Sequence, residues 1–410
     1  MDADELRGWL RLTLTPGVGN ISARKLMQAF GLPQVVFEQS ALAWSHAVGS
    51  AQVQALGQVP EGLEALLKRT LDWLAQDDPH GIRRQLVTLG DVSYPQALLN
   101  LDDPPLMLYL LGRAGFAQNS ALAQSQKDIC AINLDTSKNP EVCIDSQRSL
   151  AMVGSRNPSP QGVDNARHFA FGLAQAGVTV VSGLALGIDG AAHEGALKVS
   201  PAQLPGATVA VVGTGLDRVY PKAHRDLAHR IAEQGVLISE YPLGTPPLNA
   251  NFPKRNRLIA GLAQGTLVVE AALQSGSLIT ARLTNEQGKD VFAIPGSIHA
   301  AQSRGCHALI KQGAKLVESV DDILDELQWQ SSAKVNITSI ADKLAPESAD
   351  GNSDSASGLL AALGFDPVGL DALQARTGLA APSLQAQLMV LELAGQVASL
   401  PGGLFQRQRV

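Results

Sequence analysis

The chain has 410 residues, of which 45% are hydrophobic and 17% charged, and its formal net charge is -6 at pH 7. This length allows about two to four domains with sizeable cores, and the bulk charge does not attract a polyanion. No run of 18 apolar residues occurs, and the N-terminus MDADELRGWL is acidic where a signal peptide would be basic and then apolar. We therefore expect a cytoplasmic protein without membrane contact.

The first 77 residues place Leu, Trp, Val and Ala at three- and four-residue spacings, which predicts a small helical domain of the SAM or helix-hairpin-helix type. Within it, a turn at Gly17-Val18-Gly19 leads into a helix that begins near Ile21. Such a turn can offer free backbone N–H groups to a phosphate. It also joins helices in modules that bind only protein, and the sequence leaves both readings open.

Residues 82–329 alternate short β-branched runs with amphipathic helical segments, which predicts a parallel sheet with helices on both faces. The predicted strands are 151–154, 178–182, 208–212, 236–239, 266–270, 291–294 and 315–317. Almost every one of them ends in a glycine-rich loop. Because ligands of open α/β sheets bind at the carboxyl ends of the strands, we expect the functional site on this edge.

One stretch on this edge, NFPKRNRLIAG at 251–261, gathers Lys254, Arg255 and Arg257 beside Phe252. Cations next to a flat ring are suited to holding a polyanion locally. Arg156 follows the first of the predicted strands, and Lys222 follows Tyr220-Pro221 in another strand-end loop. Their convergence on one rim predicts a polyphosphate ligand.

Several nucleotide and catalytic motifs are absent. The chain has no Gly-x-x-x-x-Gly-Lys-Ser/Thr loop, and Arg218 stands where the dinucleotide fingerprint begun at Gly213 needs its third glycine. His193 and Asp189 have the spacing of a base and its orienting carboxylate, but such a pair more often caps and packs a helix start. We give Glu240 and Glu270, at strand ends, the same interpretation.

Three cysteines, Cys130, Cys143 and Cys306, show no metal-ligand spacing and cannot all pair. We expect reduced thiols, with neither a metal nor a cofactor.

The order of motifs GSRNPSPQG, SGLALGIDGAAHEGAL, GTGLDRVYPKAHRDLA, LISEYPLGTPP, NFPKRNRLIAGL, VVEAALQSGSLITA and VFAIPGS, ending in SRGCHALIKQGA, closely resembles the DNA-processing protein A (DprA, also called Smf) family. The resemblance covers roughly residues 94–327. It implies a non-enzymatic protein that binds single-stranded DNA and delivers it to the recombinase RecA during natural transformation. It also implies a homodimer formed through an extended Rossmann-like domain.

By this resemblance the arginine of the family's GSR motif falls on Arg156, the lysine after its YP on Lys222, and its FPxRNR stretch on Phe252–Arg257. The cations are expected to neutralise phosphates and Phe252 to stack on a base, with backbone N–H groups of the loops as phosphate cradles. The expected DNA-binding residues are Gly154, Ser155, Arg156, Gly183, Gly213, Lys222, Phe252, Lys254, Arg255, Asn256, Arg257, Ser275 and Gly276. His307 replaces the family's usual Asn, which affects one local loop contact.

The expected dimer surface lies within 306–327, at Ile310 and Leu324. The alternative is that apolar residues of this region close the core, which we prefer for Leu316 and Val317.

Two further segments depart from the α/β pattern. Residues 113–149 are polar and aperiodic, which predicts an inserted surface loop, largely mobile. Residues 330–357 have a linker composition rich in Ser, Ala and Asp.

Beyond the linker, the pattern of residues 358–410 predicts a winged helix. Its predicted recognition helix, Pro382–Glu392, carries neither Lys nor Arg, so we favour contact with protein over contact with duplex DNA.

A rival interpretation is a Rossmann-like enzyme that acts on nucleotides, because the central pattern is also similar to phosphoribohydrolases. Those enzymes carry a PGGxGTxxE loop, whereas this chain has only Pro295-Gly296-Ser297 at that place.

Overall fold

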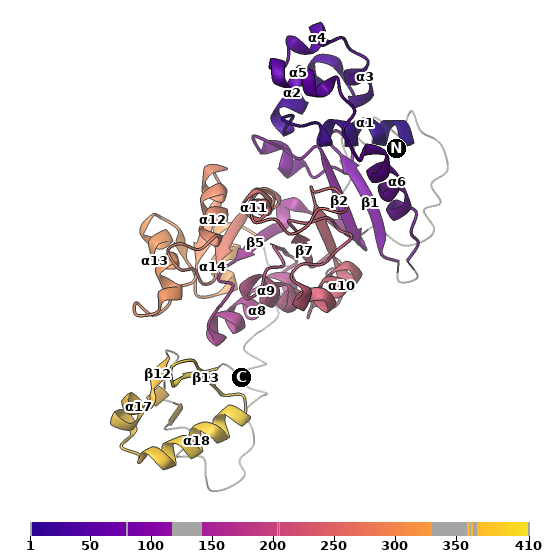
Figure 1. Ribbon diagram of the computed structural model, residues 1–410. Coiled ribbons are helices and arrows are strands. Elements are labelled where there is room, and N and C mark those ends of the chain that lie inside the picture. The colour runs from indigo at the N-terminus through magenta and orange to yellow at the C-terminus, as the bar shows by residue number, and fades with distance from the viewer. Residues whose placement is uncertain are drawn as a thin grey trace.

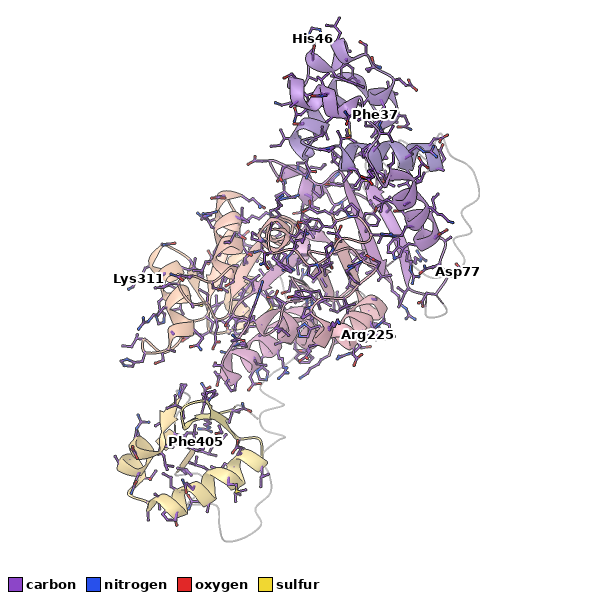
Figure 2. The ribbon with its side chains drawn as sticks, viewed as in Figure 1. Phe37, His46, Asp77, Arg225, Lys311 and Phe405 are labelled. Carbon is purple, nitrogen blue, oxygen red and sulfur yellow. The ribbon has the colours of Figure 1, made fainter. Side chains whose placement is uncertain are left out.

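The computed structural model describes residues 2–78, 81–116, 142–202, 204, 206–329, 359–360, 362–363 and 367–408. Figure 1 shows the chain passing from a group of helices, through a central sheet, to a small C-terminal unit. In Figure 2, Phe37 and His46 lie among the first helices and Phe405 lies in the C-terminal unit. Among the described residues, no helix has the length and hydropathy needed to cross a membrane.

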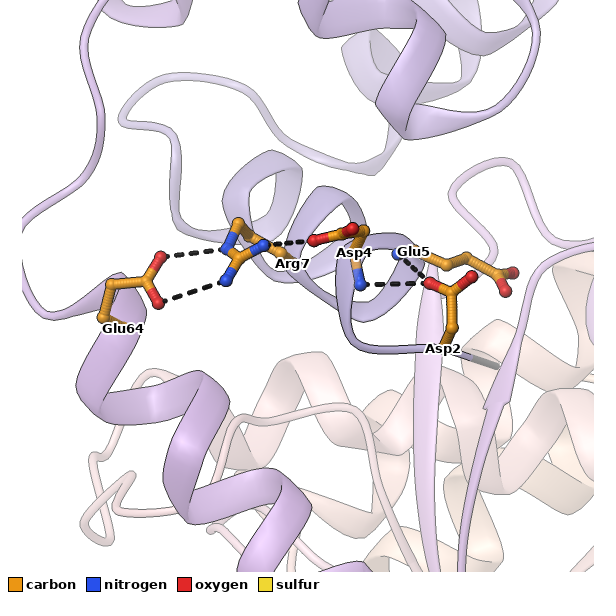
Figure 3. A network of polar contacts seen from close by, with 5 residues as sticks. All are labelled: Asp2, Asp4, Glu5, Arg7 and Glu64. Carbon is orange, nitrogen blue, oxygen red and sulfur yellow. Dashed lines mark hydrogen bonds and ion pairs between the residues drawn. The ribbon is translucent and has the colours of Figure 1, made fainter.

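The N-terminal part of the chain is helical. Its helices are α1 (Ala3–Leu14), α2 (Asn20–Phe30), α3 (Pro33–Phe37), α4 (Ala41–Ser45), α5 (Ser50–Leu56) and α6 (Leu63–Leu74). Asp2 caps α1 by accepting from the N–H groups of Asp4 and Glu5. Arg7 links α1 to α6 through Glu64, with Nε 3.0 Å from Oε1 (Figure 3). Because this ion pair is exposed, the buried apolar faces of the helices supply most of the stability.

These helices share a core with the central sheet. The rings of Trp73 and Tyr109 meet edge to face with centroids 5.8 Å apart, which joins α6 to the sheet. At the start of α2, Asn20 donates to the carbonyl of Asp103 over 3.2 Å, and Arg24 donates to that of Asp102 over the same distance. The side chains that follow the glycine turn therefore hold the helical domain against the central one.

The central sheet is doubly wound and mostly parallel, as the alternation of strands and helices predicts. Within the described residues nine strands pair in the order β1-β2-β8-β7-β6-β5-β9-β10-β11. The strands are β1 (Arg83–Thr88), β2 (Met107–Gly112), β5 (Ser149–Val153), β6 (Thr179–Ser182), β7 (Thr208–Val211), β8 (Val236–Ser239), β9 (Gly265–Val268), β10 (Asp290–Ala293) and β11 (Lys315–Leu316). All seven strands from β8 to β11 in this order are parallel, whereas β2 pairs antiparallel with β1 and with β8.

Helices cover both faces of this sheet. Buried side chains of α8, α9 and α14 pack against one face, and those of α11, α12 and α13 pack against the other. The helices are α8 (Pro160–Gln175), α9 (Ile188–Ala196), α10 (Arg225–Gln234), α11 (Asn251–Leu262), α12 (Ser277–Glu286), α13 (Arg304–Lys311) and α14 (Val320–Glu326), with short 3₁₀ turns η1 (Gln96–Asn100), η2 (Ser146–Arg148), η3 (Lys222–His224) and η4 (Ala301–Ser303).

The ends of the expected insertion are ordered. Strand β3 (Ala114–Phe116) pairs in parallel with β4 (Val142–Ile144), and Ala114 and Ile144 are buried. The expectation of a mobile loop is therefore wrong for these ends, because their apolar side chains join the core. Residues 117–141, including Cys130, lie outside the described residues, as does the Cys143 side chain. Cys306 is a buried free thiol.

The C-terminal unit has the winged-helix arrangement that the sequence predicts. Its elements are β12 (Val368–Gly369), α17 (Leu370–Thr377), α18 (Ala381–Leu393), β13 (Val397–Leu400) and β14 (Leu404–Arg407). The strands pair antiparallel in the order β12-β14-β13. The predicted linker, 330–357, lies outside the described part of the chain.

Candidate nucleic-acid interface

The carboxyl ends of the parallel strands border a groove of about 570 Å³. Its walls are the loops after β5, β6, β8 and β9 and the first turns of α11 and α12. A smaller pocket of about 60 Å³ lies beside it, between Leu186, Tyr220 and Phe252. Arg156, Phe252 and Arg255 line both hollows. The groove is thus at the edge where the strand-end loops predict a ligand.

An aromatic pair and a cation lie together between the two hollows. The Arg156 guanidinium carbon is 5.6 Å from the centroid of the Phe252 ring. The Tyr220 ring is tilted by 34° to that of Phe252, with centroids 5.7 Å apart. Phe252 also packs on Gly213, where a Cβ atom would lie only 3.2 Å from the ring. Tyr220 is 45% exposed and therefore offers the more accessible stacking face.

Three of the expected cations are exposed. Arg156 lies in the loop after β5, Lys222 begins η3 after β7, and Lys254 lies in the first turn of α11. Within the described part of the chain, none of the three forms an ion pair, so their charges remain available to an anion. Burial raises the pKa of the Asp189 and Glu240 carboxyls, and Arg156 and Lys254, respectively, oppose this, but the exposed side chains can still meet a phosphate.

Arg255 does not face the solvent, and the expectation that its side chain contacts phosphate from the surface is wrong. The residue is 4% exposed, and one terminal guanidinium nitrogen, Nη1, donates to the carbonyls of Gly183 and Val211. Burial lowers the pKa of this guanidinium, and the Asp189 carboxylate opposes the effect. A Cβ atom on Gly183 would clash with this guanidinium, so the glycine is required for the packing. Arg255 ties the ends of β6 and β7 together from below the groove.

Arg257 is likewise engaged within the protein. Its guanidinium pairs with Glu240, and its Nε lies 3.1 Å from Oδ2 of Asp103. Its side chain is 13% exposed. Burial raises the pKa of Glu240, and the Arg257 guanidinium opposes this. The expected phosphate contact by Arg257 is therefore replaced by a link from α11 to the loop before β2 and to the loop after β8.

Of the six expected backbone cradles, three already have partners. The N–H groups of Ser155, Gly183 and Ser275 donate to the Glu270 carbonyl (2.7 Å), the Asp189 carboxylate (3.2 Å) and the Ala272 carbonyl (3.0 Å), respectively. These three groups organise the loops and are not free to meet a phosphate. The other expected cradles, Gly154, Gly213 and Gly276, remain predictions. Asn256, a further expected contact, lies near Gly276, to whose carbonyl its side-chain amide donates over 3.4 Å.

The titratable groups behind the loops have structural partners. His193 is fully buried, its Nδ1 is 2.7 Å from the Thr208 hydroxyl, and burial lowers its pKa to about 3. Glu270 accepts from the N–H and the hydroxyl of Ser159, which caps α8. Burial raises the pKa of Glu270. Glu270 thus holds the start of α8, whereas His193, in the last turn of α9, packs that helix against β7 and does not cap a helix start.

The two expected dimer residues differ in environment. Leu324 is 4% exposed and packs in the core beneath α8, so it cannot form an interface, and its assignment to the dimer surface is wrong. Ile310 is only partly buried. Leu316, which we expected to close the core, is 44% exposed on edge strand β11, whereas Val317 is buried as expected. His307 makes a local contact, with Nε2 3.0 Å from the Gly296 carbonyl.

The winged helix presents an apolar surface on α18. Met389, Val390 and Leu393 are exposed there, and the helix sequence APSLQAQLMVLEL contains no cation.

A Rossmann-like sheet with a cationic and aromatic strand-end rim, joined to a winged helix, defines a DNA-binding class of protein. Residues 139–328 match the sequence model of the family described as DNA recombination-mediator protein A, and residues 343–403 match the DprA winged helix domain. The chain belongs to this DprA/Smf family of DNA-processing proteins.

Individual relatives agree with this assignment. The chain is 40% identical over 353 residues to protein Smf of Escherichia coli, which covers 84% of this chain and 81% of that protein. It is 44% identical over 239 residues to the DNA processing protein DprA of Streptococcus pneumoniae, covering 58% and 73% of the two chains. The X-ray structure of DNA processing protein A from S. pneumoniae superposes with a TM-score of 0.59 at 34% identity, covering 80% of this chain and 98% of that one.

Proposed function

We propose that the protein binds single-stranded DNA along the rim of the strand-end groove, without marked sequence preference. The observation that carries this proposal is the exposed Arg156 guanidinium beside the Tyr220–Phe252 pair, with exposed Lys222 and Lys254 two positions after Tyr220 and Phe252, respectively. Cations that follow a backbone and rings that stack on any base are the usual means of holding a single strand. Among the described residues of the rim, Arg and Asn side chains do not form a forked array for reading base edges.

This proposal is tested by titrating labelled oligonucleotides, single-stranded against duplex, at low and high salt. We expect the single strand to bind more tightly, and its affinity to fall steeply as salt rises because phosphate contacts release counterions. Equal affinity at both salt concentrations, or a clear preference for duplex, would show that the rim is not the binding site for a single strand.

We further propose that the bound strand is delivered to RecA and that the protein is not an enzyme. Both points rest on family membership, together with the absence of the phosphoribohydrolase PGGxGTxxE loop. On a single strand that is already coated by another DNA-binding protein, RecA filaments should form faster when the DprA-family protein is added. Release of free base from nucleoside monophosphates would support the enzymatic alternative instead.

For the winged helix, we propose contact with protein over contact with duplex DNA, because Met389, Val390 and Leu393 are exposed on it.

We also propose a homodimer through the surface of α13 and β11. Partly buried Ile310 and exposed Leu316 lie on these elements, beside a hollow of about 730 Å³. A two-fold interface uses the same patch on both subunits. Two grooves acting on one strand raise avidity by roughly 10²–10⁴ when the strand spans both.

Leu316→Glu is expected to give a folded monomer, because the side chain is exposed and its replacement leaves the core intact. Short oligonucleotides should bind as they do to the wild type, whereas long ones should be held about a hundredfold less tightly. Analytical ultracentrifugation reports the assembly state. If the wild-type protein sediments as a monomer at micromolar concentration, the dimer proposal is wrong.

A further inference from the structure

The groove rim carries an unusual series of apolar side chains. Between residues 183 and 300, each of the five loops after β6, β7, β8, β9 and β10 carries one exposed large hydrophobic residue. The five are Leu186 (45% exposed, after β6), Tyr220 (45%, after β7), Leu248 (50%, after β8), Leu273 (59%, after β9) and Ile298 (74%, after β10).

Exposed large hydrophobic residues of the central domain are concentrated in the loops at the carboxyl ends of the strands. In the described residues from 142 to 329, Leu316 on edge strand β11 is the sole other exposed large hydrophobic side chain. Singly exposed aliphatic residues are ordinary on protein surfaces. Here they are absent from the solvent faces of the described covering helices and are concentrated at the ends of neighbouring strands. This placement indicates a ligand that crosses the strand ends.

The loops that carry these five residues follow strands that are close together in the sheet. The strands concerned are neighbours in the order β8-β7-β6-β5-β9-β10. Adjacent strands lie about 4.8 Å apart, so the ends of the six strands together extend roughly 24 Å. The loop after β5 supplies Arg156 in place of an apolar residue, and Lys222 follows Tyr220 by two positions. Apolar and cationic side chains therefore alternate among loops that follow neighbouring strands.

We propose that Leu186, Leu248, Leu273 and Ile298, with Tyr220, form an apolar track that contacts the bases of single-stranded DNA. The inference rests on the proposed function and adds to it the orientation of the strand. The bases lie against the apolar side chains, while the interleaved cations hold the phosphates. Aliphatic contacts have no preference among base edges, which matches binding without sequence readout.

A single strand fits this track better than a protein partner does. Protein interfaces concentrate their energy in a contiguous, fully desolvated centre with a polar rim. The residues of the track instead come one from each loop, and the exposed cations that a phosphate backbone needs lie in the same series of loops, Arg156 after β5 and Lys222 after β7. A single strand offers apolar base faces and charged phosphates in alternation along its length.

The test compares Leu186→Ser/Leu248→Ser with the wild type on two probes, a thymine oligonucleotide and an abasic oligonucleotide of the same length. Both leucines are exposed, so the double variant should keep its melting temperature. We expect its affinity for the thymine oligonucleotide to fall roughly tenfold, because apolar contact area is lost. The salt slope should not change, and binding of the abasic oligonucleotide should equal that of the wild type. Leu42→Ser/Leu99→Ser, which alters two exposed leucines outside the rim, is the matched control and should bind both probes normally.

Three outcomes would overturn the track. The double variant could bind the thymine oligonucleotide as tightly as the wild type does. It could lose affinity equally for both probes, in which case the leucines do not contact bases. It could bind DNA normally but lose self-association or RecA binding, in which case the apolar residues contact protein. Failure of the proposed function is a separate result, since the wild type would then show no salt-dependent preference for a single strand.

Discussion

Arg255→Ala is expected to destabilise the protein strongly, by about 3 kcal/mol or more. The buried guanidinium donates to the carbonyls of Gly183 and Val211, and its charge stabilises the buried Asp189 carboxylate. Its removal leaves two carbonyls without their donor and a carboxylate without its cation. At about 2–4 °C for each kcal/mol, the thermal midpoint should fall by roughly 6–12 °C or more.

The matched control is Lys254→Ala, one position earlier on the same helix. Lys254 is exposed, so its removal should leave the melting temperature nearly unchanged while weakening DNA binding. Thermal melts of both variants are the measurement. If Arg255→Ala melts like the wild type and loses only DNA binding, then the guanidinium serves the ligand and not the loops.

Arg156→Ala/Lys222→Ala is expected to weaken single-strand binding by more than tenfold at about 0.1 M salt. Each lost phosphate contact lowers the magnitude of the salt slope by about 0.7 for a single strand, so two contacts lower it by about 1.4. Because both side chains are exposed and lie on the rim, the melting temperature should not change. Fluorescence titrations over a series of salt concentrations give both the affinity and the slope.

Lys68→Ala/Lys198→Ala is the control for net charge, since it removes two exposed cations from α6 and from the end of α9. It should reduce affinity only slightly. If both double variants lose the same affinity, binding follows the overall charge of the protein and not the rim.

The sheet and its functional edge could be predicted largely from the sequence. Buried parallel strands are short β-branched runs, and the glycines that follow them mark the loops at their carboxyl ends. Strands β1 and β2 were missed. The first begins with Arg83-Arg84-Gln85 and is largely not buried, so it lacks the apolar character of a core strand. The second gains its place by antiparallel pairing with β8, which a pattern of alternating strands and helices does not reveal.

The site was predicted less completely, because a motif shows which charges are near in sequence and not which partners they meet. Arg255 and Arg257 belong to the same basic stretch as Lys254, yet helical geometry turns them toward the protein. There they meet carbonyls at the ends of β6 and β7 and the carboxylates of Glu240 and Asp103. Tyr220 was missed as a stacking ring, although its position two residues before Lys222 was a usable signal.

Photo-cross-linking of a 5-iodouracil single-stranded oligonucleotide, followed by mass spectrometry of the linked peptides, tests the central claim most directly. Aromatic side chains that stack on the base should form the adducts. We expect the cross-links at Tyr220 or Phe252, on the rim of the strand-end groove. Cross-links confined to the winged helix, residues 370–407, or to the N-terminal helices would contradict the account.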